Sequence, residues 1–172
     1  SQKQKSPLTV TITQAPTSSK IAFVIGNGTS RTPINLQDLR PFGKIYGCNA
    51  LYRDFIPDYL VAVDTKMVLE LNKAGIQHQV ETWTNPNRAY NDMVGFKFFQ
   101  PSKGWSSGPT ALWFASEMTD YDTIYILGFD YEGIGTQINN IYANTQNYKA
   151  STEKATYFGN WLKQTVITCQ NF

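Results

Sequence analysis

The sequence is poor in the side chains on which many enzymes and metal proteins depend. Its 172 residues include one histidine, His78, and two cysteines, Cys48 and Cys169, which lie far apart in the chain. A zinc finger or ribbon needs more Cys and His ligands than these, and a Ser-His-Asp or Cys-His mechanism would have to use His78. Because His78 stands in a polar stretch after Gly75, we expect a solvated loop histidine and no metal centre.

Charge is scarce as well. Charged residues make up 16% of the chain, against about 25% in an average protein, and 15 basic and 13 acidic residues leave a net charge of +2. No basic block indicates nucleic-acid binding, and no apolar run approaches the roughly 18–20 residues of a membrane span. No secretory signal pattern is visible and both cysteines are interpreted as reduced thiols, so we expect a cytoplasmic protein.

Apolar residues are plentiful enough for one core. They account for 41% of the chain and aromatic residues for 14%, and the length is typical of a single domain. Residues 1–19 are rich in Ser, Thr, Gln, Lys and Pro, and within them Leu8–Ile12 alternates with period two. We therefore expect a tail or arm over residues 1–19 that pairs with a second copy of the chain, and one nucleotide-binding-like domain over residues 20–172.

In this domain, short apolar runs alternate with segments that have the apolar spacing of a helix. Ile21–Ile25 is apolar throughout, as in a strand that is buried on both faces of a parallel sheet. Further strands are expected at residues 44–49, 58–64, 79–84, 96–99 and 123–128, and helices at residues 34–39, 65–74, 107–118 and 153–166, with a loop over residues 134–149. This order predicts an α/β fold, a three-layer Rossmann-like parallel sheet with helices on both faces.

Small polar residues follow several of the expected strands. In open parallel sheets, ligands bind outside the carboxyl ends of the strands, so these residues are expected to line one pocket. The groups are Asn27-Gly28-Thr29-Ser30, Asn49, Asp64, Ser106-Ser107-Gly108 and Asp130-Tyr131.

Two of the groups suit an anion. Gly26–Ser30 and Ser106–Gly108 each place backbone N–H groups and hydroxyls before an expected helix, where a phosphate is favoured. Gly26–Ser30 lacks the lysine of a Walker loop and the third glycine of a dinucleotide-binding loop. Each group can also be an ordinary turn without a ligand, and the residues alone leave both interpretations open.

The remaining groups suit a nucleoside or a cation. Asn49 can bond a base or a ribose through its amide, or stabilise a turn. Asp64 and Asp130 can hold a ribose hydroxyl or a divalent cation such as Mg²⁺, or cap the segment that follows. Tyr131 and Tyr148 can stack on a base or donate a hydrogen bond to a phosphate, or they can pack in the core.

Two pairs of segments carry a family resemblance. VIGNGTS followed by YGCNALYRD, and WSSGPTALWFAS followed by IYILGFDYEG, resemble bacterial CMP-sialic-acid-dependent sialyltransferases of the lipooligosaccharide type. The resemblance covers about residues 20–165. Hydroxymethylpterin pyrophosphokinases of the archaeal type share these motifs, as do phage and marine bacterial proteins of uncharacterised function, and the chain is most similar to that last group.

The resemblance implies that a nucleotide or nucleotide-sugar contacts the strand-end residues. These are Asn27, Thr29 and Ser30 at the phosphate and ribose, Asn49 and Asp64 at the nucleoside, Ser106, Ser107 and Gly108 beside the phosphate or sugar, and Asp130 and Tyr131 on the opposite side.

The sialyltransferases carry a catalytic histidine where this chain has Tyr148. An unperturbed tyrosine, with a pKa of about 10, is a poor general base at neutral pH. Tyr148 and Lys149 are therefore expected to neutralise charge on a departing phosphate, and Asp64 or Asp130 is the candidate base.

Three functions follow as alternatives. The first is a nucleotide-sugar-binding glycosyltransferase of CMP-sugar type, phage-encoded and acting in the bacterial host cell. The second is a pterin pyrophosphokinase-like phosphotransferase, in which Asp64 and Asp130 bind Mg²⁺ between the phosphates of ATP. The third is a non-catalytic virion or accessory protein that uses the fold as a scaffold.

Overall fold

Six parallel strands form one open sheet in the order β5-β4-β3-β2-β1-β6. The structure is a computed structural model that describes residues 20–117, 121–130, 140–143 and 159–172. The strands are β1 (Ile21–Ile25), β2 (Lys44–Cys48), β3 (Tyr59–Val61), β4 (Glu81–Thr84), β5 (Lys97–Phe98) and β6 (Thr123–Leu127). The α/β Rossmann-like sheet that the sequence predicts is confirmed, whereas the expected arm over residues 1–19 lies outside the described residues.

Three α-helices and five 3-10 helices are described. The α-helices are α2 (Thr65–Ala74), α3 (Ser107–Glu117) and α4 (Gly159–Asn171). The 3-10 helices are η1 (Thr29–Arg31), η2 (Leu36–Leu39), η3 (Asn49–Arg53), η4 (Ile76–His78) and η5 (Arg88–Tyr90). His78, at the end of η4, is exposed, as expected of a solvated histidine.

The chain reverses its direction across the sheet at β1. From β1 it advances strand by strand to β5, and α3 then returns it to β6 on the other side of β1. Phe23 of β1 consequently pairs with Ile45 of β2 on one side and with Tyr125 of β6 on the other. The order of the strands therefore reverses between β1 and β6, which is the position where open parallel sheets usually bind their ligands.

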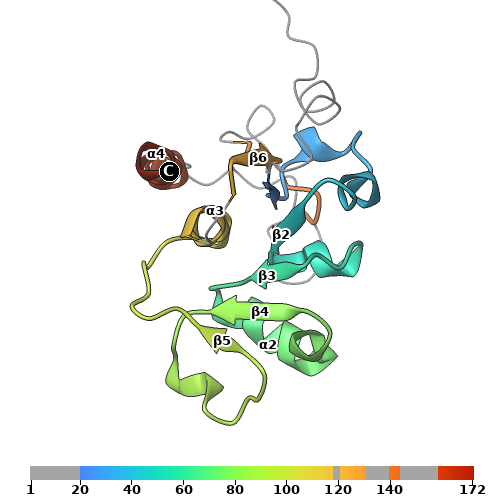
Figure 1. Cartoon of the computed structure of the whole chain (residues 1–172). Helices are drawn as coiled ribbons and strands as arrows, with labels where there is room; N and C mark the ends of the chain where they lie inside the picture. Colours follow the sequence, from blue (N-terminus) through green and yellow to red (C-terminus); the bar gives the residue numbers. More distant parts are fainter. Residues whose placement is uncertain (1–19, 118–120, 131–139, 144–158) are drawn as a thin grey trace, which may run out of the picture.

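Helices cover both faces of the sheet (Figure 1). The helices α3 and α4 lie on one face, and α2 lies on the other face with the 3-10 segments. Successive side chains of a strand point to opposite faces. Ala22 and Val24 pack in the cluster under α3, whereas Ile21, Phe23 and Ile25 pack in the cluster that includes η2 and η3. All five residues of β1 are buried, as the continuous apolar run predicted.

Aromatic side chains fill the layer between the sheet and α3. The rings of Tyr46 and Tyr59 stack with centroids 4.6 Å apart, and Phe114 of α3 meets Tyr46 edge-on at 5.4 Å. Trp83 stacks on Phe99 at 5.1 Å. Burial, followed by the hydrogen bond to Tyr121, raises the pKa of the Tyr46 hydroxyl well above its usual value. Much of the high aromatic content therefore serves this core layer.

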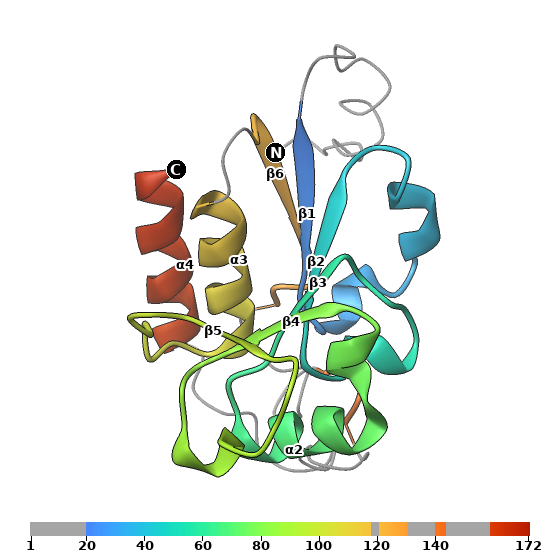
Figure 2. The same ribbon diagram turned by 60° about the horizontal axis from the view of Figure 1, so that its bottom comes forward.

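The end of the last helix differs from its prediction. The periodicity places the end at Val166, but α4 continues to Asn171. No glycine or proline follows Val166 to stop the helix, and Thr168 is buried in the added turn. Figure 2 shows α4 beside α3. The predicted start at residue 153 lies outside the described residues.

The two cysteines are unpaired and occupy different environments. Cys48, at the end of β2, is buried, whereas Cys169 on α4 is exposed. Burial raises the pKa of the Cys48 thiol to about 12, although the charge of Arg31 acts in the opposite direction. None of the helices in the described part of the chain has the length and apolar content of a membrane span.

This difference predicts selective thiol labelling. A thiol with a pKa of about 12 is ionised to about one part in ten thousand at pH 8, and the thiolate is the reactive form. We expect 5,5′-dithiobis(2-nitrobenzoic acid) to react rapidly with one thiol in the native protein and with two in denaturant. Cys169→Ser should abolish the rapid native reaction. Rapid labelling of both thiols in the native protein would contradict the buried position of Cys48.

Candidate functional site

Two glycines let the chain segments after β1 and β6 pass in contact. Gly26 N donates to Leu127 O at 2.7 Å, and Gly28 N donates to Gly128 O at 2.8 Å. A Cβ atom on Gly26 would lie 2.6 Å from the Gly128 carbonyl oxygen, and Gly128 itself has φ +73°. Neither position therefore has room for a side chain, and the contact extends the pairing of the two strands into the segments beyond them.

The side chain of Asp130 extends this contact to the start of η1. Its Oδ2 accepts a hydrogen bond from Ser30 N at 2.9 Å, and its Oδ1 accepts one from the Ser30 hydroxyl. A Cβ atom on Gly28 would lie 2.5 Å from the carboxyl carbon of Asp130. The backbone N–H and the hydroxyl of Ser30, which the sequence suggests for a phosphate, are thus bonded to a carboxylate of the same chain.

Asn27 joins the end of β1 to the end of β2. Its side chain is buried, and its Nδ2 donates to Cys48 O at 3.1 Å. Its Oδ1 accepts from Nη2 of Arg31 at 3.2 Å, and its carbonyl oxygen accepts from Ile141 N at 2.9 Å. Asn27 therefore positions the neighbouring segments and has both ends of its amide occupied.

Arg31 is a buried cation that the sequence reasoning missed. It is 7% exposed, and its Nε donates to Gly26 O at 2.9 Å. Its Nη2 also reaches Tyr142 Oη at 3.5 Å, and that hydroxyl donates to Asp54 Oδ2 at 2.7 Å. Among the described residues, no carboxylate forms an ion pair with Arg31. The signal in the sequence is a single basic residue directly after the Gly-rich segment.

Tyr142 stands between this cation and a carboxylate. Burial, followed by the hydrogen bond to Asp54, raises the pKa of the Tyr142 hydroxyl above its usual value, so the hydroxyl stays protonated and donates to Asp54. Within the described structure, the negative charge of Asp54 therefore reaches Arg31 only indirectly, through the hydroxyl of Tyr142. A buried charge without a direct partner is costly, and such a cost is typical of functional sites.

Asn49 has a strained backbone and an unsatisfied side chain. It is the one described residue other than glycine with a positive φ, at 53°. Its Oδ1 is buried and has no hydrogen-bond partner within the described structure. Because most buried polar atoms are bonded and backbone strain clusters at binding sites, both features distinguish Asn49 from an ordinary turn residue.

The start of α3 lies over the end of β3. Ser107 is buried, and its Oγ accepts from Val63 N at 3.0 Å. Ser106 O accepts from Thr110 N at 3.0 Å in the first turn of the helix. Asp64 stands next to this contact, is exposed, and makes no capping bond to α2.

The predicted residues thus share one edge but form two groups. Asn27, Gly28, Thr29, Ser30 and Asp130 lie at the ends of β1 and β6, with Asn49 beside them through the bond from Asn27 to Cys48 O. Asp64, Ser106, Ser107 and Gly108 lie at the end of β3. Tyr131, Tyr148 and Lys149 lie outside the described residues.

The described residues contain no group of three or more His, Cys, Asp or Glu side chains that could hold a metal ion. Both carboxylate oxygens of Asp130 are bonded to Ser30, whereas Asp64 is exposed and makes no capping bond. Asp130 could therefore bind Mg²⁺ only by giving up a hydrogen bond to Ser30. Asp64 could bind it without losing a capping bond.

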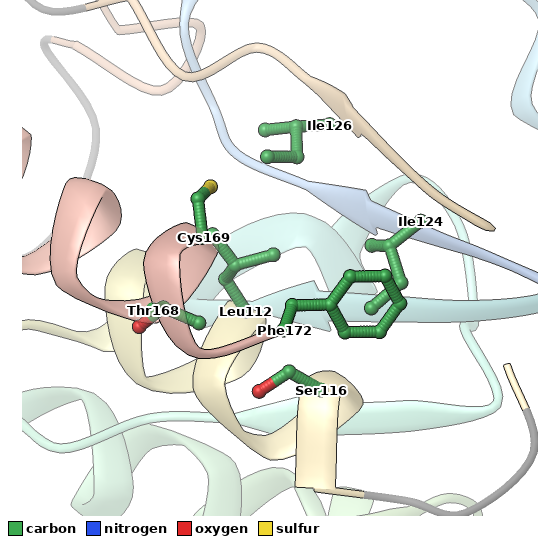
Figure 3. A pocket seen from close by; sticks show the side chains of 7 residues that line it. All are labelled: Leu112, Ser116, Ile124, Ile126, Thr168, Cys169 and Phe172. Atoms are coloured by element: carbon green, nitrogen blue, oxygen red, sulfur yellow. The ribbon is translucent and has the colours of Figure 1, made fainter. Parts of the chain in front are cut away.

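A small cavity lies between α3, β6 and α4 (Figure 3). Its volume is about 80 Å³, below the roughly 300 Å³ of the smallest usual ligand pockets. It is lined by Leu112, Ser116, Ile124, Ile126, Thr168, Cys169 and Phe172. This cavity is too small for a nucleotide.

Comparison with known proteins finds no matching family model, no matching curated protein and no matching solved structure.

The contact at Gly28 predicts a specific loss of stability. Its backbone angles, φ −69° and ψ 153°, suit any residue, so Gly28→Ala tests space alone. We expect Gly28→Ala to lower the free energy of unfolding by about 1–3 kcal/mol because the methyl group overlaps Asp130. Chemical denaturation monitored by tryptophan fluorescence would measure this.

Gly104→Ala is the matched control. Among the described residues, no atom lies within 4 Å of its added Cβ, and its φ of +70° opposes the change, so a cost of about 1 kcal/mol is expected. Wild-type stability in Gly28→Ala would contradict the close approach of Asp130.

Proposed function

We propose that the chain binds a nucleotide or nucleotide-sugar at the carboxyl edge of the sheet, with its phosphate beside Arg31, and acts as a glycosyltransferase-like protein. The observation that carries the proposal is the buried guanidinium of Arg31, which has no ion-pair partner among the described residues. It lies between the ends of β1 and β6, where the strand order reverses. An incoming phosphate would supply the charge that this position lacks.

The electrostatics favour an anion of this strength. Arg31 is held by one carbonyl, one amide and one phenol oxygen, all of them uncharged. Hydrogen bonds from guanidinium to phosphate are charge-assisted and about twice as strong as neutral ones. Because Arg31 is already buried in the folded protein, the free-energy cost of burying its charge is part of folding and not of ligand binding.

The end of the neighbouring strand, β2, offers a hydrogen-bond acceptor for a nucleoside. The buried Oδ1 of Asn49 has no partner within the described structure, and it is an acceptor for a ribose hydroxyl or an exocyclic amine. Asp64 and the Ser107-Gly108 start of α3 lie one strand further along the same edge. Neighbouring strands are about 4.8 Å apart, so the edge from β1 to β3 spans the length of a nucleotide.

The chemistry of the proposed transfer assigns separate roles to the two carboxylates. An acceptor hydroxyl attacks the sugar carbon, the bond from that carbon to the phosphate oxygen breaks, and a base takes the hydroxyl proton. Asp64 is exposed at the edge and its side chain makes no capping bond to α2, so it is the better base. Asp130 is bonded to Ser30 and positions η1. Tyr148 and Lys149 remain the proposed partners of the departing phosphate.

Nucleotide binding can be tested by thermal unfolding with CMP, CDP, UDP, GDP and ATP. A ligand at 100 times its dissociation constant stabilises the protein by about 2.7 kcal/mol. We expect stabilisation of the wild type, its loss in Arg31→Gln, and partial retention in Arg31→Lys, which keeps the charge. Circular dichroism would verify that both variants fold.

Arg40→Gln is the matched control, since Arg40 is exposed and also donates to a backbone carbonyl, that of Ile56. It should respond to nucleotide like the wild type. The proposal is wrong if millimolar nucleotide leaves the wild type unchanged, or if Arg31→Gln keeps the whole effect.

Asp130→Asn separates this proposal from Mg²⁺-dependent phosphoryl transfer. The amide oxygen can still accept from Ser30 N, so we expect a loss of about 1 kcal/mol in stability and nucleotide affinity at least equal to that of the wild type, because a negative charge near the phosphate is removed. Isothermal titration with and without Mg²⁺ would measure the affinity. Loss of Mg²⁺-dependent ATP binding in this variant would instead favour a metal ligand.

A further inference from the structure

We propose that the cavity at the carboxyl ends of β4 and β5 binds an acidic saccharide. The cavity has a volume of about 530 Å³, within the range of about 300–1,000 Å³ that is usual for ligand pockets. It is lined by Pro86, Asn87, Arg88, Tyr90, Asn91, Met93, Phe98 and Gln100. Apart from Gln100, which follows β5, these residues belong to the segment from β4 through η5 to β5, at the lower end of the view in Figure 1.

Local hydrogen bonds build the wall of the cavity. Asn87 caps η5, since its Oδ1 accepts from Ala89 N at 2.9 Å. This cap starts the turn that carries Tyr90 inward, where its side chain is 3% exposed and belongs to the cluster under α2. The short helix is thereby anchored to the core, so the residues around it stand on a fixed support.

The lining suits a sugar. Asn91 and Gln100 are exposed amides, and each offers one acceptor and two donors, which matches a pair of neighbouring hydroxyls. Pro86, Met93 and Phe98 supply apolar surface on which the C–H face of a sugar ring can lie. A purely apolar ligand would leave these amide groups without hydrogen-bond partners.

The charge of the lining selects an acidic sugar. Arg88 is the one charged side chain among the described residues that line the cavity. It is exposed, and no described carboxylate forms an ion pair with it. A guanidinium pairs with a carboxylate through two parallel hydrogen bonds, so a carboxylate on the sugar would meet the charge that the lining leaves unbalanced.

One hydrogen bond joins the wall of the cavity to the segment that carries Asp64. Tyr90 Oη donates to Thr65 Oγ1 at 3.4 Å, and Thr65 directly follows Asp64. The strands β3, β4 and β5 are neighbours and parallel, so their ends lie about 5–10 Å apart along one edge. In this respect the inference rests on the proposed function: the saccharide would be the acceptor, held next to the proposed base Asp64.

The test compares methyl β-D-glucuronide with methyl β-D-glucoside, which differ only in the carboxylate. Saturation-transfer NMR and titration without nucleotide would measure binding to the full chain. We expect the glucuronide to bind about tenfold or more tightly than the glucoside. Arg88→Gln should reduce the glucuronide to the level of the glucoside, and Asn91→Ala should weaken both ligands.

Arg40→Gln is again the control, because it removes an exposed arginine elsewhere and should leave both affinities unchanged. Equal binding of the two sugars would overturn the acidic preference, and binding of neither at millimolar concentration would overturn the site. Retained glucuronide preference in Arg88→Gln would overturn the role of Arg88.

Two further variants separate this inference from the proposed function. Arg31→Gln should keep glucuronide binding while nucleotide binding is lost, and Arg88→Gln should keep nucleotide binding. If the wild type binds glucuronide but no nucleotide, the proposed function fails and the saccharide site stands. If it binds nucleotide but neither sugar, the saccharide site fails and the proposed function stands.

Discussion

The close passage of the backbone at Gly26 and Gly128 is the constraint on which the candidate site depends. It continues the pairing of β1 and β6 past the last residue of each strand, through bonds from Gly26 N and Gly28 N. Because β6 follows β5 in the chain but lies beside β1 in space, this contact closes the position where the strand order reverses. Asp130 can reach Ser30 only because Gly28 lacks a side chain.

The polar groups at this edge divide into those that are satisfied and those that are not. Asn27, Ser30 and Asp130 bond to one another's segments and hold the edge in shape. Arg31 is buried without an ion-pair partner among the described residues. Asn49 has a strained backbone, and its side-chain oxygen Oδ1 has no hydrogen-bond partner among the described residues. Structural polar residues are normally satisfied, so the second set is where a ligand is expected.

The connections between the strands shape the rest of the edge. Between β1, β2 and β3 the chain uses only the 3-10 helices η1, η2 and η3, and Asn49, the first residue of η3, directly follows β2. The connection from β4 to β5 carries η5 and most of the residues that line the cavity of about 530 Å³. A cationic position and an amide-lined cavity thus lie on one edge, three to four strands apart.

Local pattern accounts for most of the fold and for part of the site. The apolar run Ile21–Ile25 determined a strand buried on both faces, and the polar residues at the strand ends follow from the same pattern. Helix ends were less predictable: α4 passes Val166 because no residue stops it.

Only the tertiary structure decided the contacts between residues that lie about 100 positions apart in the chain. The pairing of Ser30 with Asp130, the burial of Arg31 beside Tyr142 and the contact of Gly26 with Gly128 all depend on β6 lying next to β1. Periodicity along the chain reports which face of an element is buried, but it does not report which strands are neighbours. The sequence by itself therefore determined which residues stand at the edge, and the strand order decided which of them bond to one another across it.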